Sequence, residues 1–464
     1  MLEEKKENKT ELEKAKNDEL ETPEKNIIAY VMKIPEGAIE SIRKYEAELG
    51  TTFRIMLITD SKVTNNAKLD YKPVSNKVKD VDIKIECDIS NPDDIAAKLL
   101  PYQAEMLAIS CRSEQSMARF AKIIPHLPYL YTPTTESLQW ASDKYLMRKR
   151  LRIYDPKITP KFTLVRKNTT QERERIAKKV GFPMIVKPTN MAASLFVSIC
   201  YHEEDLKKTL NKTLKKLKKA YKNDNRLEEP KVIAEEYMDG DLYSVDSFVG
   251  MRGGVQHCPL VRQITAKSIG RDDFYNYIQM TPPDLKKETV EKAEEVAKKA
   301  IHALGIRNSI AHTELMKVDD EWKVVEIAAR MGGFRHELHH ITCGADHSLN
   351  DILIRIPKKF TIPKKITHFA CAVKWFAEKE GVITEMKGLK KIEQLESFHS
   401  IDISKKVGDR SEFARNGGRS VFNLILKNTD RSKLLADIRR VEQTVVISVE
   451  EKPAKRLINS LGLK

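Results

Sequence analysis

The stretch HTELMKVDDEWKVVEIA, residues 312–328, constrains the fold more than any other part of this 464-residue chain. Two apolar, strand-like runs flank Asp319 and Asp320, a pair of residues typical of a tight turn. We therefore predict an antiparallel hairpin. Each of its strands carries one acid, Glu314 in the first and Glu326 in the second.

The length of the turn decides where these acids point. A three-residue loop over residues 319–321 pairs Glu314 with Glu326 and puts both carboxylates on one face of the sheet. A two-residue loop places Glu314 opposite Val325, and the acids then point to opposite faces. In the first register two like charges face each other, which is tolerable only with a cation between them. Mg²⁺ suits that position, because it takes oxygen ligands and keeps places open for substrate phosphates.

The residues around the hairpin also bear on its chemistry. Arg330 offers a planar donor fork for phosphate or carboxylate oxygens, and Gly332 and Gly333 allow the backbone to approach a ligand closely. His312 lies near the acids by spacing, where it orients the metal, contacts substrate or is a structural imidazole. A surface hairpin whose glutamates face water is the alternative interpretation.

The rest of the chain divides into blocks with different patterns. Residues 1–26 are charged and free of glycine, and we expect a mobile tail. Residues 27–133 alternate short β-rich runs with helical stretches, which predicts a parallel α/β sheet. Residues 134–357 have mixed α+β signals, and residues 358–464 are mostly strands with one helix. The fold class is therefore α/β and α+β.

The net charge of +15 raises the question of a nucleic-acid partner. The densest lysine stretch, residues 205–226, places its apolar residues on one helical face, so the lysines form the solvated face of an ordinary helix. The residues of the apolar face are Leu206, Leu210, Leu214, Leu217 and Tyr221. The sequence thus favours small molecules over nucleic acid as partners.

Two further features bear on location. Six cysteines without a CxxC pair are typical of reduced thiols in the cytoplasm. No apolar run approaches the roughly 18 residues of a membrane helix, and the N-terminus has no apolar signal region. We therefore expect a cytoplasmic protein without membrane association. The sequence does not decide the oligomeric state, and a homo-oligomer is one option.

Four segments, in this order, resemble the motifs of the ATP-grasp superfamily of carboxylate–amine ligases. They are ASDKYLMRKRL, FPMIVKPTNMAASLFV, VIAEEYMDGDLYSVDSFVG and HTELMKVDDEWKVVEIAARMGG. The resemblance implies an ATP-grasp fold with three parts. These are an N-terminal parallel-sheet α/β domain, a central two-lobed nucleotide-binding domain and a C-terminal β-rich domain.

The resemblance also implies roles for individual residues. Glu314 and Glu326 match the Mg²⁺ (or Mn²⁺) ligands, and Arg330 matches the catalytic arginine at the transferred phosphoryl group. His312, Gly332 and Gly333 would border the substrate. The residues that would hold ATP are Lys144, Lys187, Ser194, Glu235, Glu236, Met238 and Asp241.

Within the superfamily, GIRNSIAHTELMKV, EIAARMGGFR and GADHSLNDI are similar to the L-amino-acid ligase (dipeptide synthetase) branch. That branch implies an ADP-forming ligase that joins a carboxylate, such as an amino acid, to an amine through an acylphosphate. Both substrates would be small molecules.

Two alternatives remain open on the sequence. The segment TNMAASLFV occupies the position of the phosphate loop but contains no glycine, which motivates a non-catalytic ATP-binding module. The run HELHH satisfies the HExxH pattern of zinc metalloproteases, with His336 and His340 as ligands and Glu337 as base. The extended form of that pattern fails, because Cys343 and Asp346 stand at its later positions.

Overall fold

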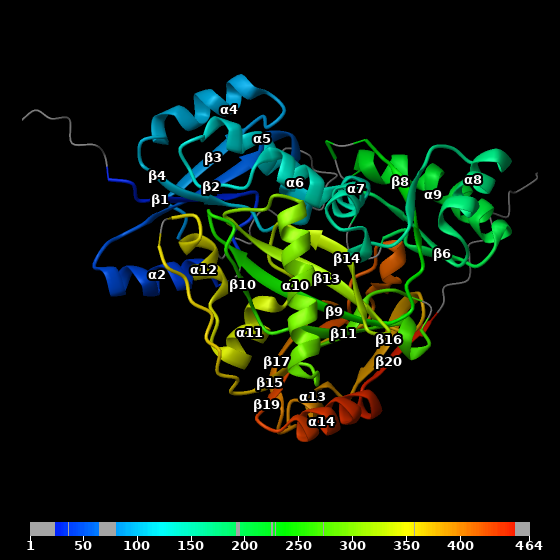
Figure 1. Ribbon diagram of the computed structural model, residues 1–464. Helices are drawn as coiled ribbons and strands as arrows, with labels where there is room; N and C mark the ends of the chain where they lie inside the picture. The colour runs from blue at the N-terminus through cyan, green and yellow to red at the C-terminus, as the bar shows by residue number, and fades with distance from the viewer. Residues whose placement is uncertain are drawn as a thin grey trace, which may run out of the picture.

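The computed structural model describes residues 24–35, 37–64, 80–191, 195–223, 226–227, 229–271, 273–356 and 358–450. Most of the tail expected over residues 1–26 lies outside the described residues, as does Ser194. Figure 1 places the N-terminal sheet at one corner of the molecule and helix α14 at the opposite end.

The N-terminal block forms a four-stranded parallel sheet of order β3-β2-β1-β4, as the alternating pattern predicted. Each strand is short and rich in buried aliphatic residues because helices pack on the sheet. The strands are β1 (Ile27–Val31), β2 (Arg54–Asp60), β3 (Ile83–Cys87) and β4 (Met106–Ser110). The accompanying helices are α2 (Ala38–Leu49), α3 (Ser61–Thr64), α4 (Pro92–Leu99) and α5 (Met117–Ile123).

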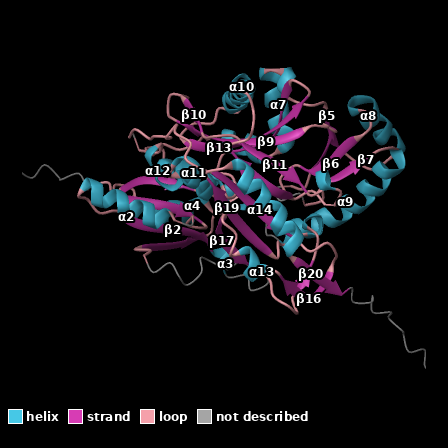
Figure 2. Ribbon diagram, turned by 90° about the horizontal axis from the view of Figure 1, so that it is seen from below, coloured by secondary structure: helices cyan, strands magenta, loops and turns pink. Residues whose placement is uncertain are grey.

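A second, antiparallel sheet of order β5-β8-β6-β7 forms a separate lobe, with two helices beside it in Figure 2. Its strands are β5 (Phe162–Val165), β6 (Met184–Pro188), β7 (Ser198–Cys200) and β8 (Val232–Glu236). The helices are α8 (Thr170–Val180) and α9 (Glu203–Asn223).

Helix α9 is the lysine-rich segment. Leu206, Leu210, Leu217 and Tyr221 are buried and Leu214 is partly buried, which confirms the predicted apolar face.

The largest sheet has the order β14-β13-β9-β11-β12-β15-β19-β17, and β10 pairs with β9. It joins strands from the block 134–357 to strands from the block 358–464, through the pairing of β12 with β15. The boundary at residue 357 stays a prediction, and no break in the sheet coincides with it. The strands are β9 (Asp241–Val249), β10 (Val255–His257), β11 (Val261–Thr265), β12 (Asn276–Thr281), β13 (Ser309–Val318), β14 (Glu321–Ala328), β15 (Phe369–Trp375), β17 (Phe398–Ile403) and β19 (Phe422–Asn428).

Helices cover this sheet and join the three sheets into one body. Helix α10 (Lys287–Ala303) packs against the β13–β14 hairpin through buried alanines, which allow a close approach (Figure 1). The remaining helices near the hairpin are α6 (Thr135–Ser142), α7 (Lys144–Tyr154), α11 (Arg335–Cys343) and α12 (His347–Leu353).

The C-terminal block ends in a small sheet of order β18-β16-β20 beside helix α14. The strands that the sequence predicted in this block are present, and a helix follows Asp430 as expected. The elements are β16 (Gly381–Lys387), α13 (Leu389–Ile392), β18 (Arg410–Ser411), α14 (Arg431–Thr444) and β20 (Val446–Glu450). Within the described ranges, no helix is both long and apolar enough to span a membrane.

The register of the β13–β14 hairpin differs from both registers proposed from the sequence. The turn has two residues, since Val318 pairs with Glu321, yet Glu314 still pairs with Glu326. A β-bulge reconciles these observations: Leu315 pairs with Val324, and Val325 is the extra residue between the two pairs. The inference that a two-residue loop separates the acids was therefore wrong, because one inserted residue restores the original face.

Candidate active site

Lys144, the first of the two lysines predicted to bind ATP, is the first residue of helix α7. The side chain of Asp143 caps the helix by accepting hydrogen bonds from two backbone N–H groups, so the position of the first helical residue is fixed. Lys144 Nζ lies 2.8 Å from Glu326 Oε1 and donates to the carbonyl of Met191, also at 2.8 Å. Burial lowers the pKa of Lys144, but the charge of Glu326 outweighs it and the pKa is raised. This lysine therefore stays charged beside the predicted metal acid.

The second candidate lysine, Lys187, is part of a buried cluster on the small lobe. Its Nζ lies 2.8 Å from Glu235 Oε2, and Arg148 holds the same carboxylate with Nε and Nη2 at 2.9 and 3.1 Å. Burial raises the pKa of Glu235, but the two cations outweigh it and lower the pKa to about 2. Burial also lowers the pKa of Lys187. The Glu235 carboxylate is thus fully matched by cations of the chain itself.

Arg148 also explains the β-bulge. Its Nη1 donates to the carbonyl of Val324 and its Nη2 to the carbonyl of Val325, at 2.8 Å for the second bond. A bulge leaves backbone groups without a partner in the strand ladder, and a buried carbonyl without one is costly. One guanidinium therefore links strand β8, through Glu235, to the strand that carries Glu326.

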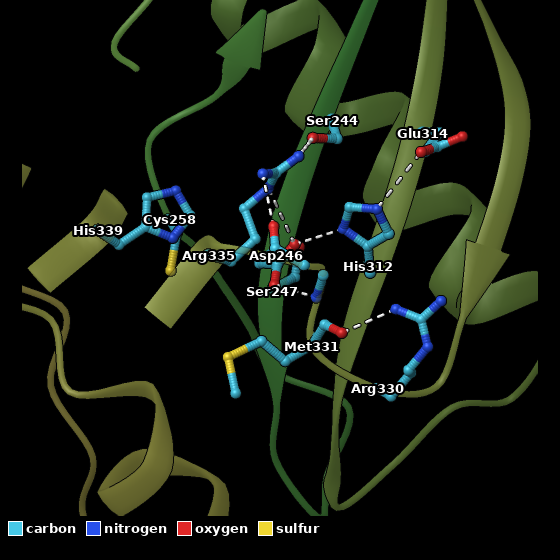
Figure 3. A network of polar contacts seen from close by, with 12 residues as sticks. Ser244, Asp246, Ser247, Cys258, His312, Glu314, Arg330, Met331, Arg335 and His339 are labelled. Carbon is cyan, nitrogen blue, oxygen red and sulfur yellow. Dashed lines mark hydrogen bonds and ion pairs between the residues drawn. The ribbon is translucent and has the colours of Figure 1, made fainter. Parts of the chain in front are cut away.

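Glu314, the other acid predicted to bind metal, lies in a network drawn in Figure 3. His312 Nδ1 is 2.6 Å from Asp246 Oδ1, and His312 Nε2 is 3.6 Å from Glu314 Oε1. Asp246 is fully buried on β9, where His312 and Arg335 face it. Burial raises the pKa of Glu314, but His312 and nearby arginines outweigh it, so the pKa is lowered and the carboxylate is ionised.

Arg330 follows strand β14 and turns toward the N-terminal sheet. Its Nε contacts Glu114, in the segment after β4, and its Nη1 donates to the carbonyl of Met331 at 2.8 Å (Figure 3). The N–H of Gly332 donates to Asp246 Oδ2 at 2.9 Å, and this hydrogen bond fixes the turn that follows Arg330. A Cβ at Gly332 would lie 2.4 Å from His312 Nδ1, so this position requires glycine. The next residue, Gly333, has no such neighbour.

The remaining predicted nucleotide residues lie along the end of β8 and the start of β9. Glu236 accepts from the N–H of Lys161 at 3.1 Å, Met238 is half-buried, and Asp241 is exposed and pairs with Arg262 at 3.0 Å. Their contacts to adenine or ribose stay predictions.

The structure brings most of the predicted site together. Electrostatic interactions join Glu114 to Arg330, Lys144 and His312, and join Lys187 to Glu326. The two acids predicted to bind metal, both lysines and Arg330 therefore interact electrostatically in one part of the structure. Asp241 pairs with Arg262 instead.

A small cavity borders Arg330 and Met331 on the side of the N-terminal sheet. Tyr30, Ser348 and Arg355 line it, and all three are buried. Among described residues, no hydrogen-bond partner is present for the Tyr30 hydroxyl, the Ser348 hydroxyl, or Nε and Nη1 of Arg355. Buried polar atoms without partners are rare in proteins, and the cavity volume of about 10 Å³ leaves room beside them for no more than a single water molecule.

The HELHH run lies on helix α11, where His336 and His340 share one face with ring centroids 6.3 Å apart. Glu337 is exposed and His336 half-buried, beside Gly37 of the N-terminal block. In the part of the chain that the structure describes, neither histidine belongs to a cluster of metal-ligating side chains. The histidine between them, His339, does belong to one.

Several site residues escaped the sequence analysis. Arg148 stands four residues after Lys144 on a helix, and Asp246 is a lone acid within an apolar strand, so both gave a readable signal. Glu114 lies in an irregular segment far along the chain from Arg330 and gave none.

The comparisons define the class of protein. Residues 180–337 match the ATP-grasp domain family, so this chain contains an ATP-grasp domain. The resemblance derived from the four motifs is confirmed, and so is the ATP-grasp fold.

Individual relatives narrow the class. The chain is 28% identical to alanine–anticapsin ligase of Bacillus subtilis (strain 168), over 53% of this chain and 54% of that protein. It is 27% identical to the D-alanine–D-alanine ligase of Flavobacterium johnsoniae, over 33% of this chain and 44% of that protein. The chain thus spans about half the length of the relatives it matches.

Among solved structures, the L-amino acid ligase from Bacillus licheniformis superposes with a TM-score of 0.71 at 16% identity, over 93% of this chain and all of that one. At this identity the likeness concerns the fold.

Proposed function

We propose that this protein is an ATP-dependent, ADP-forming ligase that joins the carboxylate of a small molecule, an amino acid in the first instance, to an amine. One observation carries the proposal: Glu314 and Glu326 face each other across the bulged hairpin, with Lys144 2.8 Å from Glu326 and the charges of Lys187 and Arg330 acting on the same acid. The amino-acid ligases among the relatives support the same reaction class.

The paired acids fit a hard divalent cation. Two carboxylates on directly opposed residues repel one another, and the chain supplies only partial neutralisation. Lys144 contacts Glu326, whereas the ring of His312 is 3.6 Å from Glu314. Glu314 and Glu326 would hold Mg²⁺ or Mn²⁺, and the ion would supply charge neutralisation for the acid pair and for the phosphates of ATP.

The residues of the chain then have separate tasks in the first step. Lys144 and Lys187 hold the phosphates of ATP as point charges, and Lys144 exchanges its contact with Glu326 for one with phosphate oxygen. A substrate carboxylate oxygen attacks the γ-phosphorus, the bond to the β-phosphate oxygen breaks, and ADP and an acylphosphate result. Arg330 stabilises the charge on the transferred group.

In the second step the amine nitrogen attacks the acyl carbon, the bond to phosphate breaks, and the amine loses a proton. Arg330 again faces the developing oxyanion, a role that requires no rearrangement because Glu114 and the Met331 carbonyl already orient it. No nucleophilic side chain is needed in either step.

We place the carboxylate of the acid substrate beside the Arg330 guanidinium, whose charge and planar donors suit it. Glu114, next to Arg330, offers a carboxylate to an ammonium group. An amino acid carries both kinds of charge. The proposal also places the protein in the cytoplasm, because all six cysteines are free thiols.

The test is release of phosphate from ATP with Mg²⁺ over pooled amino acids and other small carboxylates and amines. Release that needs both a carboxylate and an amine, and that is lost in Arg330→Ala, supports the ligase. ATP binding without release in any pool would favour the non-catalytic ATP-binding module, which the glycine-free loop motivates. Absence of ATP binding would contradict both.

A further inference from the structure

Three buried side chains outside the proposed active site converge on one point. Cys258 lies between β10 and β11, His339 on α11, and His347 is the first residue of α12. Each is completely buried. Their ligand atoms, Cys258 Sγ, His339 Nδ1 and His347 Nε2, all lie within 4.8 Å of one another.

The individual distances approach those of a coordination sphere. Cys258 Sγ is 3.5 Å from His347 Nε2, and His339 Nδ1 is 2.8 Å from the same nitrogen. Tetrahedral zinc with Zn–N of about 2.0–2.1 Å and Zn–S of about 2.3 Å separates its ligand atoms by roughly 3.3–3.8 Å. The thiol already meets this spacing, and the two imidazoles need to part by about half an ångström.

The surroundings of the histidines also match a metal site. His339 Nε2 donates to the carbonyl of Pro259 at 3.0 Å, which leaves the lone pair of Nδ1 directed at the cluster. A ligating histidine in proteins usually makes this kind of bond with its other nitrogen. His347 Nδ1 is buried without a hydrogen-bond partner among described residues, 4.0 Å from Asp246 Oδ2.

A bound metal ion would account for the state of His347 Nδ1, the nitrogen without a hydrogen-bond partner among described residues. With Nε2 bound to metal, the proton of His347 resides on Nδ1 and faces the Asp246 carboxylate. The thiol of Cys258 gives up its proton as the metal–sulfur bond forms, so one proton leaves for each metal bound.

We propose that Cys258, His339 and His347 form a structural zinc site that is separate from the Mg²⁺ site at the hairpin. Two imidazoles and a thiolate are borderline-soft ligands that select zinc over magnesium. Cys343, one turn after His339, lies outside this group, and its thiol donates to the His339 carbonyl at 3.2 Å.

The position of the proposed metal site in the fold indicates a structural role. The metal would tie the β10–β11 connection to α11 and α12, and both helices follow the turn that carries Arg330. Asp246 would link the site to Gly332, because its Oδ2 accepts the N–H of that residue. The ion would therefore fix the turn below the proposed active site without touching substrate.

Metal content of the full chain tests the proposal. The chain is expressed without a histidine tag in zinc-supplemented medium, purified without chelator and measured by mass spectrometry of the elements. We expect about one zinc per chain, lost in Cys258→Ser and His347→Gln. The matched controls His336→Gln and His340→Gln change the same chemistry on the other face of α11 and should retain zinc. Glu314→Gln should retain it too, which separates this site from the proposed active site.

A second measurement covers variants that fail to fold. Wild-type protein grown in cobalt-supplemented, zinc-depleted medium should have a thiolate-to-cobalt charge-transfer band in the near ultraviolet. Wild-type chain with neither zinc nor the cobalt band would overturn the proposal and leave a hydrogen-bonded cluster. Zinc that persists in the Cys258→Ser and His347→Gln variants but is lost in His336→Gln would overturn it as well. Neither readout depends on ligase activity.

Discussion

Two clusters of charged residues in the ATP-grasp domain have opposite balances. On the small lobe, one carboxylate, Glu235, meets two cations, Arg148 and Lys187, and all three are buried. On the hairpin, two partly exposed carboxylates, Glu314 and Glu326, have one lysine and one histidine as direct neighbours. Two arginines also act on them, but each of these is paired with another acid.

This difference in charge balance distinguishes charged residues that stabilise the fold from charged residues that are available to bind a ligand. A buried charge is tolerated when partners of the chain neutralise it, and removing one partner then destabilises the fold. An opposed acid pair that the chain neutralises only in part is stabilised further by an added cation. The Arg148–Glu235 pair of the first cluster is therefore expected to govern folding, while its Lys187 also serves the proposed reaction. The second cluster is expected to govern catalysis and metal binding.

Arg148→Ala should produce the largest effect on stability. It removes the bidentate partner of Glu235 and leaves the carbonyls of Val324 and Val325 unpaired, which should lower the free energy of unfolding by about 3–5 kcal/mol. Urea denaturation measures this loss. Lys149→Ala, an exposed neighbour on the same helix, is the control and should change little. A loss equal to that of the control would contradict the structural role.

Arg330→Ala should instead affect turnover. Loss of a donor aimed at developing charge typically costs about 10²–10³ in kcat, or roughly 3–4 kcal/mol. Steady-state phosphate release measures kcat, and urea denaturation checks the fold. Arg330→Lys keeps the charge but not the planar fork, so only partial recovery is expected. Full activity in Arg330→Ala would remove this residue from the mechanism.

Glu314→Gln should change the dependence on Mg²⁺ while the protein stays folded. Removing a ligand oxygen should raise the Mg²⁺ concentration for half-maximal activity by at least about 10-fold, since even outer partners of metal ligands contribute that much. Titration of activity with Mg²⁺ at saturating ATP measures the shift. Glu321→Gln, an exposed acid on the same hairpin, is the matched control. Equal shifts in both variants would favour a general electrostatic effect over direct ligation.

The smallest expected effect is the contribution of the ionised Glu235 carboxylate to the pH dependence of stability. Its pKa in the folded protein is about 2, below the ordinary value of 4.5. The stabilisation is therefore present above pH 4.5 and is lost as the pH falls from 4.5 toward 2. At pH 4 the advantage of the wild type over Glu235→Gln should have decreased by somewhat less than about 1 kcal/mol relative to pH 6. Urea denaturation at the two pH values measures it, and a constant difference would contradict the assigned charge.

The sequence predicted many candidate site residues but not the contacts among them. Glu314, Glu326 and Arg330 were identified from one hairpin of 19 residues, 312–330, because turn signals and alternation are local properties. Lys144 and Lys187 followed from the order of motifs. The bulge at Val325 was not foreseen, because it depends on Arg148, which reaches the strand from a helix far away in the chain.

The same contrast applies to the cysteine–histidine cluster. The sequence drew attention to HELHH, since the spacing of His336 and His340 is a local pattern. The fold turns those histidines away from the cluster and turns His339 inward, toward Cys258 and His347.

The amino-acid sequence by itself determined the succession of strands and helices, the ATP-grasp class and the identity of the principal charged residues. These follow from periodicity, turn residues and short motifs, which involve neighbours along the chain. Only the tertiary structure decided which acids share a face, which carboxylate is neutralised internally and which three side chains meet around a buried point. Those outcomes depend on contacts between residues tens to hundreds of positions apart, and such contacts leave no local pattern in the sequence.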